Sequence, residues 1–179
     1  GGARPNAHRQ SDARLLCAEF RGLMASRKTS GTRGERDVDP ENHVVKLCVE
    51  GMQAEGAGDL ERARAVFTQA WEQATDDYEH CIASHYLARH QGTPEETLHW
   101  NETSMRYAES VADERVEDFI PSLLLNLGHS HEQLGNTGEA ARFYEQAVTR
   151  ADALPEGRYG KIVRDAASAG RTRVSGEPA

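Results

Sequence analysis

Apolar residues recur at helical spacing in blocks that short glycine-containing turns divide. In the clearest block, the turn at Gly135-Asn136 separates two amphipathic patterns. Their small and large apolar positions are Leu124, Leu127, Gly128, Ala140, Tyr144 and Ala147. Counted back in the same register, an earlier block places Leu47, Gly51, Ala63, Phe67, Ala70 and Ala74 around a turn at Gly56-Ala57-Gly58. The pattern predicts an all-α chain built from helical hairpins.

The spacing of Leu124, Gly128, Ala140 and Tyr144 resembles the tetratricopeptide repeat, a helix–turn–helix unit of about 34 residues. The resemblance implies a right-handed α-solenoid of about three helix pairs with a C-terminal capping helix. We expect the repeats at about 44–77, 78–111 and 121–154 and the capping helix at about 156–169, all within a repeat domain at 38–170. An end helix with a polar outer side is what such arrays need to cover the last apolar face.

The middle repeat departs from the family pattern. Its small, large and small positions hold Thr97, Asn101 and Ser104, and His85 stands where the other repeats have glycine. About nine extra residues precede the third repeat, and we expect them to lengthen the helices around residues 111–120. Pro121 should kink or restart the helix there.

Several residue patterns predict where helices begin and end. Asp39-Pro40 and Asp59 are candidate N-terminal caps of the first two helices. Thr93, Pro94 and Glu96 have the spacing of a capping box, with proline at the first helical position. The run at 154–157 is a stop signal before the capping helix, and residues 171–179 are predicted to fray.

Residues 1–37 form a basic arm with few large apolar side chains, a composition typical of a flexible segment. Within it, Leu15, Leu16, Phe20 and Leu23 fit one face of a short helix at 11–26. This helix could dock on the repeats, bind a partner helix or stay nascent, because an isolated helix of this length is marginal in water.

The net charge of −8 combines +4 in residues 1–37, −15 in residues 38–157 and +3 in residues 158–179. An acidic body is a poor platform for nucleic acid, so we expect no nucleic-acid partner and favour a basic or polar protein.

An apolar run long enough to span a membrane and a signal-peptide pattern are both missing. With three widely spaced cysteines, these features favour a reducing, cytoplasmic setting. The Arg-, Ala- and Glu-rich composition favours a small bacterial, actinobacterial protein, and Gly1-Gly2 in place of Met leaves open whether the chain is a fragment.

The sequence offers little for cofactor or metal chemistry. The glycine turns lack the preceding strand that a phosphate-binding loop requires, and common nucleophile and zinc motifs are missing. His80, His85 and His90 are five residues apart, which does not place them on one helix face. We therefore expect no cofactor and no metal. A less favoured enzyme hypothesis uses Tyr86, His90, His129 and Glu132 as acid–base groups.

The resemblance instead implies a binding surface, because the first helix of each pair lines a concave groove. Carried onto this register, the candidate groove residues are Met52, Glu55, Glu79, Ile82, Tyr86, Arg89, His90, Leu125, Asn126, His129, Glu132 and Gln133. The Lys and Asn that grip chaperone tails in one branch of the family are replaced by Cys48, Met52 and Ala83. The favoured function is a non-catalytic module that binds a peptide or partner helix. The alternative is a ligand- or peptide-sensing regulatory module, and oligomeric state and partner identity stay open.

Overall fold

The computed structural model describes residues 42–111, 114–154 and 156–176, and every regular element in these ranges is helical. The arm and its candidate helix at 11–26 lie outside them. The elements are α2 (His43–Gly56), α3 (Leu60–Gln73), α4 (Asp77–Leu87), the 3-10 turn η1 (Ala88–His90), α5 (Pro94–Val111), α6 (Glu114–Glu117), α7 (Ile120–Gln133), α8 (Thr137–Asp152) and α9 (Arg158–Ser175). The prediction of an all-α fold is confirmed.

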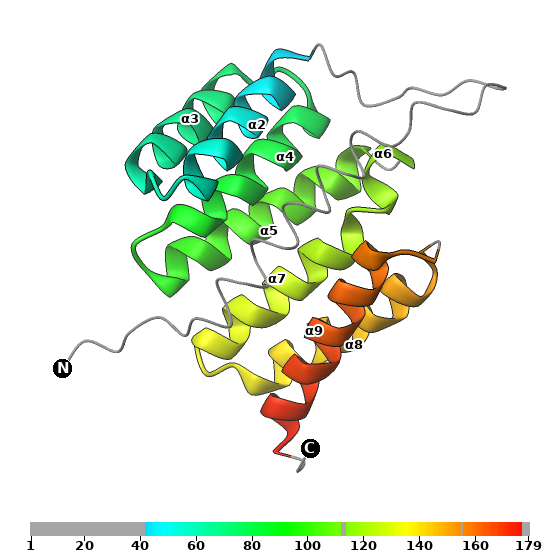
Figure 1. Cartoon of the computed structure of the whole chain (residues 1–179). Helices are drawn as coiled ribbons and strands as arrows, with labels where there is room; N and C mark the ends of the chain where they lie inside the picture. The colour runs from blue at the N-terminus through cyan, green and yellow to red at the C-terminus, as the bar shows by residue number, and fades with distance from the viewer. Residues whose placement is uncertain (1–41, 112–113, 155, 177–179) are drawn as a thin grey trace, which may run out of the picture.

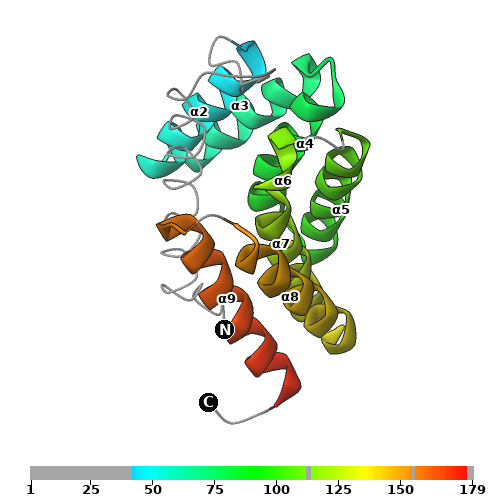
Figure 2. The same cartoon turned by 90° about the vertical axis from the view of Figure 1, so that its right-hand side faces the viewer.

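The helices pack as consecutive hairpins that stack into one array (Figure 1). The hairpins are α2 with α3, α4 with α5, and α7 with α8, and α9 packs on α8 and α7. The array is curved, with α2 and α9 toward its two ends and α5 at its back (Figure 2). We call the side lined by α2, α4, α7 and α9 the inner face.

The starts of the first helices follow from local capping chemistry. Asp59 accepts a hydrogen bond from the backbone N–H of Arg62, as predicted for a cap of α3. The capping box of α5 is confirmed by reciprocal hydrogen bonds between Thr93 and Glu96, each 3.2 Å long. The cap of α2, however, is Asn42 rather than the predicted Asp39. Its side-chain oxygen accepts a hydrogen bond from Val45 N–H, so the helix begins three residues later.

The extra residues before the third hairpin form a separate short helix, α6, and do not simply lengthen the neighbouring helices. The helix α5 runs for 18 residues and ends at Val111. A new helix, α7, then begins at Ile120 with Pro121 in its first turn. A proline is tolerated there because the first N–H groups of a helix have no intrahelical acceptor. The predicted restart at Pro121 is therefore confirmed.

The core of the first and third hairpins depends on a glycine opposite an aromatic ring. A Cβ atom added to Gly51 would lie 2.3 Å from the Phe67 ring, and one added to Gly128 would lie 2.7 Å from the Tyr144 ring. Both rings are buried, with exposures of 0% and 1%. The close approach of helix and ring needs a residue without a side chain, which explains the glycine in the repeat pattern.

The middle hairpin reverses these sizes. His85 replaces the glycine, and its buried ring packs edge-on against Phe119 at 4.7 Å. The position of the large ring holds Asn101, whose amide donates a hydrogen bond to Ser130 of α7 at 2.9 Å. Ser104 likewise donates to the Cys81 carbonyl. These contacts give partners to the Asn101 amide nitrogen and the Ser104 hydroxyl inside the core, and they account for polar residues at two positions where the family pattern is apolar.

The last helix, α9, spans 18 residues and ends at Ser175, six residues beyond the predicted end at 169. Gly170, directly before the tail that was predicted to fray, lies against Tyr144: an added Cβ would be 2.4 Å from the ring. The side of α9 away from α8 carries exposed polar residues such as Lys161 and Asp165, which pair with each other. A polar outer side is what an end helix requires.

Candidate functional site

The same position near the end of each inner helix holds a charged residue, and the sign of that charge alternates along the array. In α2 this residue is Glu55, and after α4 it is Arg89, which lies in η1. Glu132 holds the equivalent position in α7, and Arg173 in α9 completes the row. Neighbours pair in twos: Arg89 lies 2.6 Å from Glu55 and Arg173 lies 2.9 Å from Glu132. We call these four residues the charge row.

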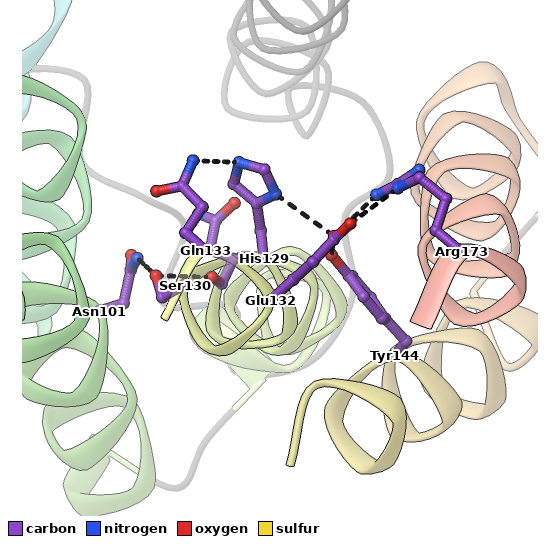
Figure 3. Close-up of polar contacts among 8 residues, drawn as sticks. Asn101, His129, Ser130, Glu132, Gln133, Tyr144 and Arg173 are labelled. Atoms are coloured by element: carbon purple, nitrogen blue, oxygen red, sulfur yellow. Dashed lines mark hydrogen bonds and ion pairs between the residues drawn. The ribbon is translucent and has the colours of Figure 1, made fainter. Parts of the chain in front are cut away.

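The Glu132 end of the row is a connected polar network (Figure 3). Arg173 binds the Glu132 carboxylate with two parallel hydrogen bonds of 2.9 Å, from Nε and Nη2. The Tyr144 hydroxyl donates to the same carboxylate at 2.5 Å. His129 Nδ1 lies 3.8 Å from it, and Gln133 contacts the other ring nitrogen of His129 at 3.0 Å. Two-point binding by a guanidinium fixes both the position and the orientation of a carboxylate.

The electrostatics of this network favour an ionised Glu132. Hydrogen bonding by Arg173, helped by the Tyr144 hydroxyl, lowers the pKa of Glu132 to about 2 even though partial burial opposes the shift. Burial and the adjacent carboxylate raise the pKa of Tyr144. The phenol therefore stays protonated and donates, and the carboxylate stays charged across the physiological range.

The Glu55 end of the row has a similar pair with different neighbours. The side chains of Arg89 and Glu55 are 16% and 15% exposed. His90 Nε2 lies 3.5 Å from Glu55, and the Arg89 guanidinium sits 5.9 Å from the centre of the Tyr86 ring. Both glutamates lie in the last turn of their helices, where the helix dipole disfavours negative charge, so a bound arginine offsets that cost.

The predicted groove residues divide by burial. Met52, Glu79, Ile82, Tyr86 and Leu125 are buried. Glu55, Arg89, His90, Asn126, His129 and Glu132 are half-buried, and Gln133 is exposed. The structure thus brings Glu55, Arg89 and His90 together, and also His129, Glu132 and Gln133. Asn126 lies one helical turn before His129 in α7, with its amide 3.4 Å from the ring of His85.

Glu79 has a structural position. Its carboxylate accepts hydrogen bonds from the Asn42 amide at 2.6 Å and from the Thr75 backbone at 2.6 Å. Burial opposes ionisation, but these hydrogen bonds hold the pKa of Glu79 below its usual range. The side chain therefore links the start of α2 to the start of α4.

The four residues of the enzyme hypothesis lie in two sets of contacts. His90 contacts Glu55 and the Phe67 ring, whereas His129 contacts Glu132 and Gln133. Among the residues that the structure describes, His, Cys, Asp and Glu side chains form no group of three that could hold a metal ion. Within the same ranges, each helix is too short or too polar to cross a bilayer.

Sequence reasoning missed Arg173 and Gly170. The signal was present, since Arg173 follows Gly170 by three residues just as Arg89 follows Tyr86. Tyr86 stacks on the Phe67 ring at 5.0 Å. Gly170 lies against the Tyr144 ring, which holds the position of Phe67 in the third hairpin. By this register, α9 is the counterpart of α4 in the third hairpin's neighbourhood, and the irregular intervals between repeats hid the match in the sequence.

The fold and the charge row define an all-α helical-repeat protein. A family model for the tetratricopeptide repeat matches residues 121–153, which span α7 and α8. Residues 121–153 thus match one tetratricopeptide repeat, and the described helices as a whole form an all-α array consistent with such repeats. None of the curated proteins or solved structures compared with the chain matches it significantly. Repeats of this family generally mediate protein–protein interactions and are typically non-catalytic. The predicted bacterial origin and cytoplasmic setting stay predictions.

Proposed function

We propose that the chain is a non-catalytic interaction module that binds a peptide or a partner helix on its inner face. The observation that carries the proposal is the charge row, where accessible polar groups border buried apolar residues such as Tyr86 and Leu125. Interfaces of this kind depend on a few aromatic and arginine residues surrounded by polar groups. The row supplies that composition along successive inner helices.

The alternating signs of the row favour a partner with both charges. A peptide that presents a base near Glu55 or Glu132 and an acid near Arg89 or Arg173 would find a complement at either pair. Because each arginine is already paired, the partner gains selectivity and a defined orientation more than raw affinity. The bound partner is expected to be polar at this edge and apolar where it meets the inner helices.

Capture of partners from the native host tests the proposal. We would compare the wild-type chain with the double variant Arg89→Ala plus Gln133→Ala, which removes two inner-face contacts. The matched control is Arg62→Ala plus Gln146→Ala, at exposed positions of α3 and α8. We expect the inner pair to reduce capture of specific partners at least tenfold and the control pair to leave it unchanged. Equal capture by both variants, with circular dichroism showing intact folds, would exclude the inner face.

A further inference from the structure

The basic arm contains one segment with the pattern of a groove-binding helix. Leu16, Phe20 and Leu23 follow the i, i+4, i+7 spacing by which amphipathic helices anchor in apolar grooves. At about 100° per residue, Met24 would extend this apolar side, and Ala18 and Ala25 would lie opposite. The segment 11–26 thus has one side suited to an apolar surface.

We propose that segment 11–26 of this chain docks on its own inner face and competes there with the partner. The docking stands on the observations below, whereas the competition rests on the proposed function. The inner positions that the repeat register assigns to α2, α4 and α7 include Met52, Ile82 and Leu125, and all three are less than 9% exposed in the full chain. At positions that the repeat register assigns to the concave side, burial of this kind is what an apolar occupant of the inner face would produce.

The tether makes the docking geometrically easy. The segment ends at Ser26, and α2 begins at His43. The 16 residues between them can span about 50 Å when extended, whereas α2, with its 14 residues, is about 21 Å long. A flexible tether of this length raises the local concentration of the segment into the millimolar range. Even a weak contact would then be well populated within one chain.

Charge also favours an occupant from this chain. The arm carries +4 and faces a body of −15. Within the arm, Arg27, Lys28, Arg33 and Arg36 lie in the tether, where they would run beside the acidic repeats. Attraction between the basic arm and the acidic body would strengthen apolar docking and would weaken as salt rises.

Cys17 provides a direct reporter because it adjoins Leu16 inside the segment. We would measure alkylation of each cysteine in the full chain by mass spectrometry and compare Cys17 with the same residue in a synthetic peptide of residues 1–30. Cys48 and Cys81 are buried and serve as an internal control for folding. Docking predicts that Cys17 reacts at least tenfold more slowly in the chain than in the peptide.

Two double variants of the full chain locate the contact. Leu16→Asp plus Phe20→Asp should raise the Cys17 rate to that of the peptide while Cys48 and Cys81 stay protected. Ala18→Asp plus Ala25→Asp adds the same charge on the opposite side and should preserve protection. An excess of a peptide of residues 11–26 carrying Cys17→Ser should also release Cys17 in the wild-type chain.

Three outcomes would overturn the proposal. Cys17 in the wild-type chain could react as fast as in the peptide, which excludes docking. The two double variants could release Cys17 equally, which excludes a specific apolar contact. Protection could vanish on dilution, which would assign the contact to a second copy of the chain. None of these results depends on partner capture, so failure here and failure of the proposed function are separate findings.

Discussion

Phe67 in α3 and Tyr144 in α8 hold the same position in the first and third hairpins, but different neighbours enclose their rings. Phe67 lies against Gly51 on one side and stacks on Tyr86 at 5.0 Å on the other. Tyr144 lies between Gly128 and Gly170, and its hydroxyl reaches Glu132 at 2.5 Å. An aromatic neighbour in one hairpin is matched by a glycine in the other.

This difference shows how two hairpins keep one geometry with different side chains. The first hairpin fills its space with two stacked rings and keeps its core apolar. The third lets α9 approach closely through Gly170 and uses the tyrosine hydroxyl to join the core to Arg173 and Glu132. Substitution of Tyr144 should therefore remove a direct hydrogen bond to the charge row, whereas Phe67 reaches the row indirectly, through Tyr86 and His90.

Removing either ring should have the largest effect. Phe67→Ala and Tyr144→Ala each delete a fully buried ring, so each should lower the free energy of unfolding by about 3–5 kcal/mol. Urea denaturation of the full-length variants measures the change. A loss below about 1 kcal/mol for either variant would mean that its hairpin does not depend on the ring.

Gly170→Ala should be the next most damaging change. Its Cβ would lie 2.4 Å from the Tyr144 ring, so overpacking should cost about 1–3 kcal/mol. The matched control is Gly138→Ala in α8, where an added Cβ meets nothing within 4 Å. Alanine there should stabilise the helix by up to about 1 kcal/mol. If the two variants melt alike, the close contact of α9 with Tyr144 is wrong.

Acid should weaken the middle hairpin through His85. Burial, with a smaller contribution from the charge of Arg89, lowers the pKa of His85 from 6.5 to about 3. The folded state prefers the neutral ring, so stability from this group is complete above pH 6.5 and declines as pH falls toward 3. The expected loss is roughly 2 kcal/mol at pH 5. His85→Gln should flatten the denaturation profile between pH 7 and pH 5, and an unchanged profile would contradict a buried neutral ring.

Tyr144→Phe makes the smallest change, because it gives the third hairpin the ring of the first. It removes the hydroxyl but leaves the two-point Arg173–Glu132 pair. The loss should be about 0.5–1.5 kcal/mol, and thermal melting against wild type measures it. A loss as large as that of Tyr144→Ala would assign most of the third hairpin's stability to the hydroxyl.

The features of the fold that repeat along the chain could be predicted from the sequence because they depend on nearby residues. The capping box at Thr93 and Glu96, the restart at Pro121 and the glycine–ring pairs all depend on residues close in the chain or one repeat apart. His85 and Asn101 were noted as departures, but their new partners, Phe119 and Ser130, lie in another hairpin. Long-range packing of that kind does not follow from periodicity.

The candidate site was predicted in part for the same reason. Glu55, Arg89 and Glu132 follow from the repeat register, whereas Arg173 lies 41 residues after Glu132. The family interval of about 34 residues would not reach it. Its role became visible through the length of α9, which the sequence alone underestimates because Gly170 resembles a helix stop. The burial of Ile82 and Tyr86 likewise depends on the folded array.

Hydrogen exchange on the full chain with and without a captured partner tests the inner-face account most directly. The account predicts slower amide exchange in α4 and α7, at Asp77–Leu87 and Ile120–Gln133, when the partner binds. It predicts little change in α3, α5 and α8, whose outer sides face away from the charge row. Slower exchange confined to α3, α5 and α8 would place the partner on the opposite side and contradict the account.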